Sequence, residues 1–285
     1  EKRARLSAMR AAPALLAALC AASAAPSFAA GARLHPRTFL ATAALRAVPS
    51  RPALEAPAPG PVETAREVWR MTRPQNVPFA IGLVAVGTRA ARLHGAPPPD
   101  LAQLALVTAL VCVTTSTSAL ANDYYDFLGE ADALKETRAL VRGAVTPGAV
   151  KRVLKWSYGA FLAGLCLVRG PGLRLCIYAN TLATLLYTRH FKPLPGVKNA
   201  LCAAVIATAV AVGAAVPAGG VLPGLAASWP VVVVVGLGMW HREMVMDVGD
   251  AAGDKAAGVR TVAVLVGPRR ALALSVAPLA VAAAV

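Results

Sequence analysis

The chain has 285 residues, of which 57% are hydrophobic and only 15% are charged, and its formal net charge is +15. Because about a quarter of the residues in an average soluble domain are charged, we expect much of this chain to lie in lipid. Its Lys and Arg are spread over the N-terminal region and short loops without an aromatic-interleaved basic stripe, which argues against nucleic acid as a partner and is typical of the cytoplasmic loops of membrane proteins.

The N-terminal region differs from the rest of the chain in its charge. Residues 2–54 contain no Asp or Glu but eight Lys and Arg among many Ala and Pro, a composition typical of an organelle transit peptide. The apolar stretch at 11–32 keeps a secretory signal open as an alternative. Many prolines at 47–62 indicate a linker. We therefore expect a transit peptide and linker at 1–62, a membrane domain at 63–285, and a location in a chloroplast membrane or, alternatively, the mitochondrial inner membrane.

Apolar segments of near 20 residues, the length that a bilayer core requires, follow one another along the remaining chain. They lie at about 75–92, 102–121, 150–168, 172–188, 198–217, 222–241 and 269–285. This pattern predicts an all-α, polytopic bundle of transmembrane helices. The loops after the second, fourth and sixth segments carry most of the Lys and Arg, so we expect them on the cytoplasm-like side of the membrane.

Acidic residues are concentrated in two short windows. Nine of the 14 Asp and Glu fall in them: Asp123, Asp126, Glu130, Asp132 and Glu136 in the first, and Glu243, Asp247, Asp250 and Asp254 in the second. Each window follows an even-numbered segment, so both are expected at the same face of the membrane. Carboxylates at the ends of membrane helices are costly, and their concentration indicates a compensating cation.

The spacing within each window supports a shared binding site. Side chains three or four residues apart stack on one face of a helix. The residues with this spacing are Asn122, Asp126 and Glu130 in the first window, and Asp247, Asp250 and Asp254 in the second. Oxygen ligands of this kind suit Mg²⁺, which commonly bridges a few carboxylates and substrate phosphates. The alternative is that these acids are solvated loop charges that balance neighbouring Lys and Arg.

Both windows also resemble known motifs. The sequence NDYYDF at 122–127, followed by Asp132, resembles the first aspartate-rich motif of the UbiA superfamily of intramembrane prenyltransferases. The sequence DVGDAAGDKAAGVRT at 247–261 resembles the second. Smaller similarities are RPQN at 73–76 and YTRHFK at 187–192. The two long motifs occur in the expected order and after the expected segments, which makes the resemblance specific.

The resemblance implies a helical bundle of nine spans and Mg²⁺-dependent transfer of a polyprenyl group from its diphosphate to a lipophilic acceptor within membrane lipid. By position in the motifs, the expected metal ligands are Asp126, Asp132, Asp247, Asp250 and Asp254. The expected diphosphate-binding residues are Asn122, Arg138, Lys192, Lys255, Arg260 and Asn76. The expected catalytic residues, which would deprotonate the acceptor, are Asp123 and Asp250.

The chain departs from the family pattern in several places. Glu130 stands where many members have Asp, and Asp132 is the nearest aspartate, a spacing more like that of dihydroxynaphthoate prenyltransferases. About seven of nine expected spans are present, so the membrane domain is expected to be incomplete at its C-terminal side. We expect an aromatic quinone precursor, similar to dihydroxynaphthoate or homogentisate, as the acceptor. A chlorin and a glycerol-phosphate lipid remain open.

Two other classes of protein are compatible with acids in a helix bundle. A transporter usually places its ionisable residues at mid-depth in broken helices, whereas here they gather at one mouth, which favours the enzyme. A non-catalytic membrane scaffold with the same fold is the remaining alternative.

Overall fold

The computed structural model describes residues 60–128, 137–192, 194–256 and 258–284, and every regular element in these ranges is helical. The elements are α2 (Pro61–Met71), η2 (Pro74–Asn76), α3 (Val77–Leu93), α4 (Leu101–Leu128), α5 (Pro147–Leu167), α6 (Pro171–Leu186), η3 (Tyr187–Phe191), α7 (Val197–Ala218), α8 (Val221–Ala256), α9 (Val262–Val266) and α10 (Pro268–Ala284). Residues 58–285 form one compact unit. The predicted all-α fold is confirmed, whereas nearly all of the predicted transit peptide and linker lies outside the described residues.

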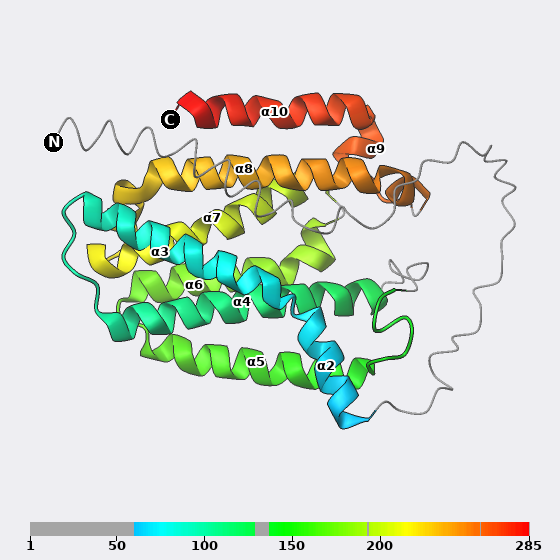
Figure 1. Ribbon diagram of the computed structural model, residues 1–285, viewed down its shortest axis with the longest axis horizontal. Helices are drawn as coiled ribbons and strands as arrows, with labels where there is room; N and C mark the ends of the chain where they lie inside the picture. The colour runs from blue at the N-terminus through cyan, green and yellow to red at the C-terminus, as the bar shows by residue number, and fades with distance from the viewer. Residues whose placement is uncertain (1–59, 129–136, 193, 257, 285) are drawn as a thin grey trace, which may run out of the picture. The chain divides into compact units, whose positions relative to one another are not determined.

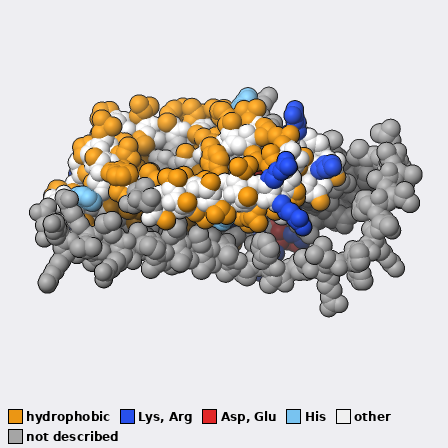
Figure 2. Space-filling model, turned by 90° about the horizontal axis from the view of Figure 1, so that it is seen from above, with side chains coloured by type: hydrophobic (Ala, Val, Ile, Leu, Met, Phe, Trp, Pro, Cys, Tyr) orange, Lys and Arg blue, Asp and Glu red, His pale blue; other side chains and the backbone are white. Residues whose placement is uncertain are grey.

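Each of the seven predicted spans lies on a helix, and these seven helices run along a common direction while α2 crosses them (Figure 1). In the described part of the chain, α4, α7 and α8 are long and apolar enough to cross a membrane by length and composition. The shorter α3, with 17 residues, is about 25 Å long at 1.5 Å per residue. The face in Figure 2 is mostly hydrophobic, with Lys and Arg gathered toward one end, as expected of helices that contact lipid.

Helix α7 lies in the interior of the bundle and packs against α3 and α8. Glycine makes the contact with α3 possible. A β-carbon on Gly87 would lie 1.9 Å from the carbonyl oxygen of Val210, and one on Gly213 would lie 2.2 Å from the carbonyl oxygen of Val84. Thr88 fixes the same contact because its hydroxyl donates a hydrogen bond to the carbonyl oxygen of Gly213 at 3.0 Å. The two backbones therefore touch directly, as small residues allow in membrane helices.

Helices α4 and α8 both continue beyond the apolar segments from which they were predicted. The second segment was expected to end near residue 121, but α4 runs to Leu128. The sixth was expected to end near residue 241, but α8 runs to Ala256. Asn122 and Asp126 therefore lie on α4, and Asp247, Asp250 and Asp254 lie on α8, so the spacing of three and four residues does set a helical face for these residues. Glu130 lies outside the described residues.

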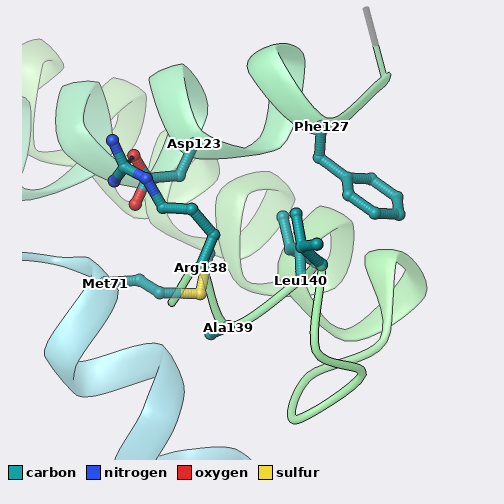
Figure 3. Close-up of a pocket in the computed structure, with 7 residues that line it drawn as sticks. Met71, Asp123, Phe127, Arg138, Ala139 and Leu140 are labelled. Carbon is teal, nitrogen blue, oxygen red and sulfur yellow. Dashed lines mark hydrogen bonds and ion pairs between the residues drawn. The ribbon is translucent and has the colours of Figure 1, made fainter. Parts of the chain in front are cut away.

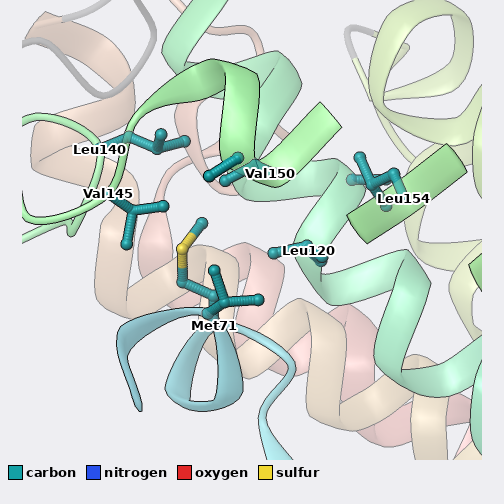
Figure 4. Close-up of a cluster of buried hydrophobic side chains, with 9 residues drawn as sticks. Met71, Leu120, Leu140, Val145, Val150 and Leu154 are labelled. Atoms are coloured by element: carbon teal, nitrogen blue, oxygen red, sulfur yellow. The ribbon is translucent and has the colours of Figure 1, made fainter. Parts of the chain in front are cut away.

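Helix α2 packs against the same end of the bundle. One buried cluster joins α2 to this end of the bundle (Figure 4). It contains Val68 and Met71 of α2, Leu120 of α4, Leu140 of the connection after α4, and Val150 of α5. Burial of these side chains fixes α2 beside the first acidic window, because apolar area removed from solvent stabilises the contact.

An ion pair strengthens the docking of α2. The Glu67 carboxylate is buried and accepts a hydrogen bond from Arg142 at 2.6 Å and another from Arg70 at 2.7 Å. Arg142 belongs to the connection between α4 and α5, so this contact ties the connection to α2 at the edge of the candidate site.

Candidate functional site

The first acidic window is built around Asp126, on the last turns of α4. This residue is 5% exposed, and the ammonium group of Lys192 donates to both of its carboxylate oxygens, at 2.5 and 2.6 Å. The amide of Asn122, one helical turn earlier, donates to Oδ2 of Asp126 at 3.0 Å. The predicted stacking of these two residues on one helical face is therefore present, and the buried charge of Asp126 is balanced by Lys192.

The carboxylate of Asp123, on an adjacent face of α4, accepts hydrogen bonds from two arginines. Arg73 and Arg138 each donate to its Oδ1 at 3.0 Å. Figure 3 shows the Arg138 guanidinium against the Asp123 carboxylate, beside a small pocket of about 10 Å³ whose lining includes Met71 and Phe127. A volume of that size has room for about one water molecule. Asp123 therefore serves here as an anchor for two cationic side chains from different segments.

Arg73 adopts an unusual backbone conformation to make this contact. Its φ is +52°, in the left-handed region that residues other than glycine rarely enter. The residue lies between α2 and η2 and is followed by Pro74, so the chain turns sharply at this point. Local strain of this kind is concentrated at functional positions in proteins.

The second acidic window is anchored by Asp247 on α8, which is 5% exposed. Two successive residues in the first turn of α7 contact its carboxylate. Lys198 forms an ion pair with Oδ1 at 2.5 Å, and the side-chain amide of Asn199 donates to Oδ2 at 2.9 Å. The first turn of α7 therefore carries the groups that neutralise and fix this buried acid.

One short stretch of chain thus serves both windows. Lys192 follows the π-helical turn η3, and Lys198 lies six positions later at the start of α7. The first lysine binds Asp126 on α4 and the second binds Asp247 on α8. The same stretch of chain therefore contacts one acid from each window through a lysine.

The other predicted site residues are more accessible. Asp250, Asn76, Lys255 and Arg260 are exposed, whereas Asp254 is half-buried. Asp132 lies outside the described residues. The exposed side chains among them are able to reach a ligand at the rim of the site.

The donors fit a hard cation such as Mg²⁺, although no compact metal cage is present in the described ranges. Within those ranges, no three His, Cys, Asp or Glu side chains lie close enough together to hold one ion. Mg²⁺ typically takes one or two protein carboxylates and completes its coordination with water and substrate phosphate. Buried Asp126 and Asp247, each with an amide beside its carboxylate, match that requirement.

Comparisons with known proteins identify the family of this chain. A family model described as the UbiA prenyltransferase family matches residues 80–285. The chain belongs to the UbiA prenyltransferase family. It is therefore a prenyltransferase and an integral membrane protein, as the sequence predicted. The UbiA fold is also found in a solved UbiA homolog from Aeropyrum pernix K1, with a TM-score of 0.63 and 23% identity over 73% of this chain and 76% of the other.

Curated relatives of this UbiA prenyltransferase carry a more specific name. The digeranylgeranylglyceryl phosphate synthase of Halobacterium salinarum is 39% identical over 221 residues, which are 75% of this chain and 74% of the relative. The synthase of the same name from Natronomonas pharaonis is 35% identical over 214 residues, which are 74% and 73% of the two chains. The name of these relatives does not support the aromatic quinone precursor that we expected as the acceptor, and their archaeal origin does not support a chloroplast or mitochondrial location.

Sequence reasoning missed several residues of the site. In the sequence, Arg73 belongs to the short RPQN similarity at 73–76, and Lys198 is one of many cations in the loops. Asn199 was not among the predicted site residues, although it is an amide in the first turn of a largely apolar helix of 22 residues. Its position as a polar residue at the end of a membrane helix, on the same face of the membrane as both acidic windows, is a signal that could have identified it.

Proposed function

We propose that this UbiA prenyltransferase transfers a geranylgeranyl group from its diphosphate to the free hydroxyl of a glyceryl phosphate lipid that already carries one such group. The observation that carries the proposal is the pair of buried acids, Asp126 and Asp247. Each is paired with a lysine, Asp126 with Lys192 after η3 and Asp247 with Lys198 in the first turn of α7. The similarity to digeranylgeranylglyceryl phosphate synthases supports the choice of donor and acceptor. Neither a transporter nor a scaffold explains that similarity.

The diphosphate is expected to bind between the two acidic windows. Mg²⁺, held there by Asp126 and Asp247 with Asp250 and Asp254 at the rim, would supply positive charge to the leaving diphosphate. Lys192 already lies at this position, and its ammonium group would donate to phosphate oxygens as it now donates to carboxylate oxygens.

The remaining predicted residues keep supporting roles toward the diphosphate. They are Asn122, Arg138, Lys255, Arg260 and Asn76, with Asp132 toward the metal ion. Asn122 holds Asp126 in place through its amide. The exposed residues Asn76, Lys255 and Arg260 would contact the diphosphate as it enters the site.

The acceptor's phosphate is expected to lie beside the arginines of α2 and of the α4–α5 connection. Arg73 and Arg138 share the single carboxylate of Asp123, and Arg142 pairs with Glu67. This arrangement brings two guanidinium groups to one point of the site. A phosphate monoester would accept charge-assisted hydrogen bonds from these guanidinium groups, whereas an uncharged ring would not.

The reaction needs one C–O bond to break and another to form. The allylic C–O bond of the donor breaks and diphosphate departs with its electrons, while the acceptor hydroxyl oxygen attacks the allylic carbon to form an ether. The hydroxyl proton is expected to pass to Asp250, which is exposed. Asp123 is better suited to position Arg73 and Arg138, since its Oδ1 already accepts from both.

The test is prenyl transfer by the purified protein in lipid nanodiscs with labelled geranylgeranyl diphosphate and Mg²⁺. Geranylgeranylglyceryl phosphate, homogentisate and dihydroxynaphthoate are supplied as separate acceptors, with an EDTA control for each. We expect a labelled ether lipid from the first acceptor only, and none in EDTA. Prenylation of an aromatic acceptor with no ether lipid formed would overturn the proposal.

A further inference from the structure

Among the described residues, one polar atom of Asn199 finds no hydrogen-bond partner. The residue is 1% exposed and lies in the first turn of α7. Its Nδ2 donates to Asp247, and because a carboxylate only accepts hydrogen bonds, the amide must turn its NH₂ group toward that residue. The carbonyl oxygen Oδ1 is then left buried, with no hydrogen-bond partner among the described residues. Buried acceptors without a partner are rare in native structures and require an explanation.

The contacts of the Asn199 amide and of its partner Asp247 indicate the kind of ligand that would satisfy this oxygen. The NH₂ group of the same amide contacts the buried, negatively charged carboxylate of Asp247. Lys198 is the cation that balances this carboxylate, at 2.5 Å. The Lys198 side chain is 13% exposed and that of Asp247 is 7% exposed, so solvent screens the pair little. An amide carbonyl beside a buried carboxylate is the donor set that a hard divalent cation prefers.

We propose that Oδ1 of Asn199 is a ligand of the divalent cation that Asp247 holds, and that Lys198 competes with this cation for the Asp247 carboxylate. The inference rests on the proposed function only in taking a divalent cation as the ion at this site. It adds a ligand from α7 to those expected from the two acidic windows on α4 and α8. It also gives the adjacent lysine an opposing effect, because two cations repel one another at a single carboxylate.

The alternative is that Asn199 only orients Asp247 through its NH₂ group. Three variants separate the two roles. Asn199→Asp keeps an oxygen at this position but loses the donor to Asp247, whereas Asn199→Leu loses both. Lys198→Met removes the competing charge and leaves the carboxylate in place. Thr208→Val is the matched control on α7, because within the described ranges the Thr208 hydroxyl donates to the carbonyl of Ala204 in its own helix and to no other group.

The experiment measures Mn²⁺ binding to the full chain in detergent, followed by electron paramagnetic resonance of the free ion, with no prenyl substrate present. We expect Asn199→Leu to raise the Mn²⁺ dissociation constant about tenfold or more, the scale of lost metal-site interactions. Asn199→Asp should bind Mn²⁺ at least as tightly as the wild type, and Lys198→Met should bind it several-fold more tightly, a factor that follows from removing a neighbouring like charge. Thr208→Val should match the wild type. Thermal unfolding of each variant confirms that it is folded.

Different results separate the possible failures. Equal Mn²⁺ affinity of the wild type and Asn199→Leu, or weaker binding by Asn199→Asp than by the wild type, would overturn the ligand role of Asn199. Weaker binding by Lys198→Met would overturn the competition. Neither result bears on the choice of acceptor, which the transfer assay above decides separately, and prenylation of an aromatic acceptor would leave the cation site intact.

Discussion

The ammonium group of Lys192 lies within 2.6 Å of both carboxylate oxygens of Asp126, and this contact joins the end of α4 to the connection that follows η3. The Asp126 side chain is 6% exposed, while that of Lys192 is 30% exposed. The acid is therefore fixed within the fold, whereas the lysine keeps access to a ligand. A side chain in that position can hold the fold together and bind an anionic substrate.

The first prediction concerns this lysine. Lys192→Met leaves a buried carboxylate with only the Asn122 amide as its described partner, so we expect the free energy of unfolding to fall by on the order of 2–3 kcal/mol. The apparent KM for the prenyl diphosphate should rise about tenfold or more, because a charge-assisted hydrogen bond is lost. Steady-state kinetics and thermal unfolding measure the two effects. Lys192→Arg keeps the charge and should lose less of both, and a Lys192→Met enzyme with unchanged KM would contradict the role.

The second prediction separates backbone strain from side-chain function at Arg73. Arg73→Gly and Arg73→Ala both remove the guanidinium from Asp123, so both should lower the transfer rate about tenfold, the scale of one lost charge-assisted hydrogen bond. Only glycine tolerates a φ of +52° without cost. Arg73→Gly should therefore be more stable than Arg73→Ala by about 1 kcal/mol. Thermal unfolding of the pair tests this, and equal stability would show that the turn relaxes to another conformation.

Sequence reasoning predicted the helices well because their signal is local. Apolar length alone identified the segments that became α3 and α10, and residue spacing indicated that Asn122 and Asp126 share a helical face. The contact between them depends only on one turn of α4. Such features follow from the geometry of a single helix and need no knowledge of what packs against it.

What the sequence did not predict depends on contacts between distant segments. Asp247 and Asp250 have the same side chain and lie three residues apart, yet one is buried and the other exposed. The difference arises because the first turn of α7, with Lys198 and Asn199, covers Asp247. The sequence of α8 alone does not show that α7 packs over Asp247. Residue type and spacing therefore led us to predict similar roles for the two acids.

The third prediction concerns the contact between α3 and α7. Gly87→Ala would place a β-carbon 1.9 Å from the carbonyl oxygen of Val210, which is backbone and cannot rotate away. The helices would have to separate, at an expected cost of about 1–3 kcal/mol. Gly82→Ala is the matched control on α3, because a β-carbon there meets no atom within 4 Å. It should be neutral or slightly stabilising. Thermal unfolding in detergent compares the two variants, and equal stability would contradict the tight packing.

The last prediction compares one acid from each window. Asp126→Ala and Asp250→Ala should each lower the rate of prenyl transfer by over about a hundredfold, since each would remove an oxygen ligand for the ion that offsets the charge of the departing diphosphate. Their effects on folding should differ. Asp126→Ala leaves the ammonium group of Lys192 without its partner and should destabilise the protein by about 1–3 kcal/mol. Asp250 is exposed, so Asp250→Ala should leave the unfolding temperature close to that of the wild type.

The measurements are prenyl transfer and thermal unfolding of the wild type and both variants, each in Mg²⁺ and in EDTA. Activity of the wild type should disappear in EDTA and return when Mg²⁺ is added. Loss of stability together with activity identifies a residue that belongs to the fold as well as to the site, whereas loss of activity alone identifies a residue that acts on the ligand. An Asp250→Ala enzyme as active as the wild type, or full activity in EDTA, would show that the second window does not support the reaction through a divalent cation.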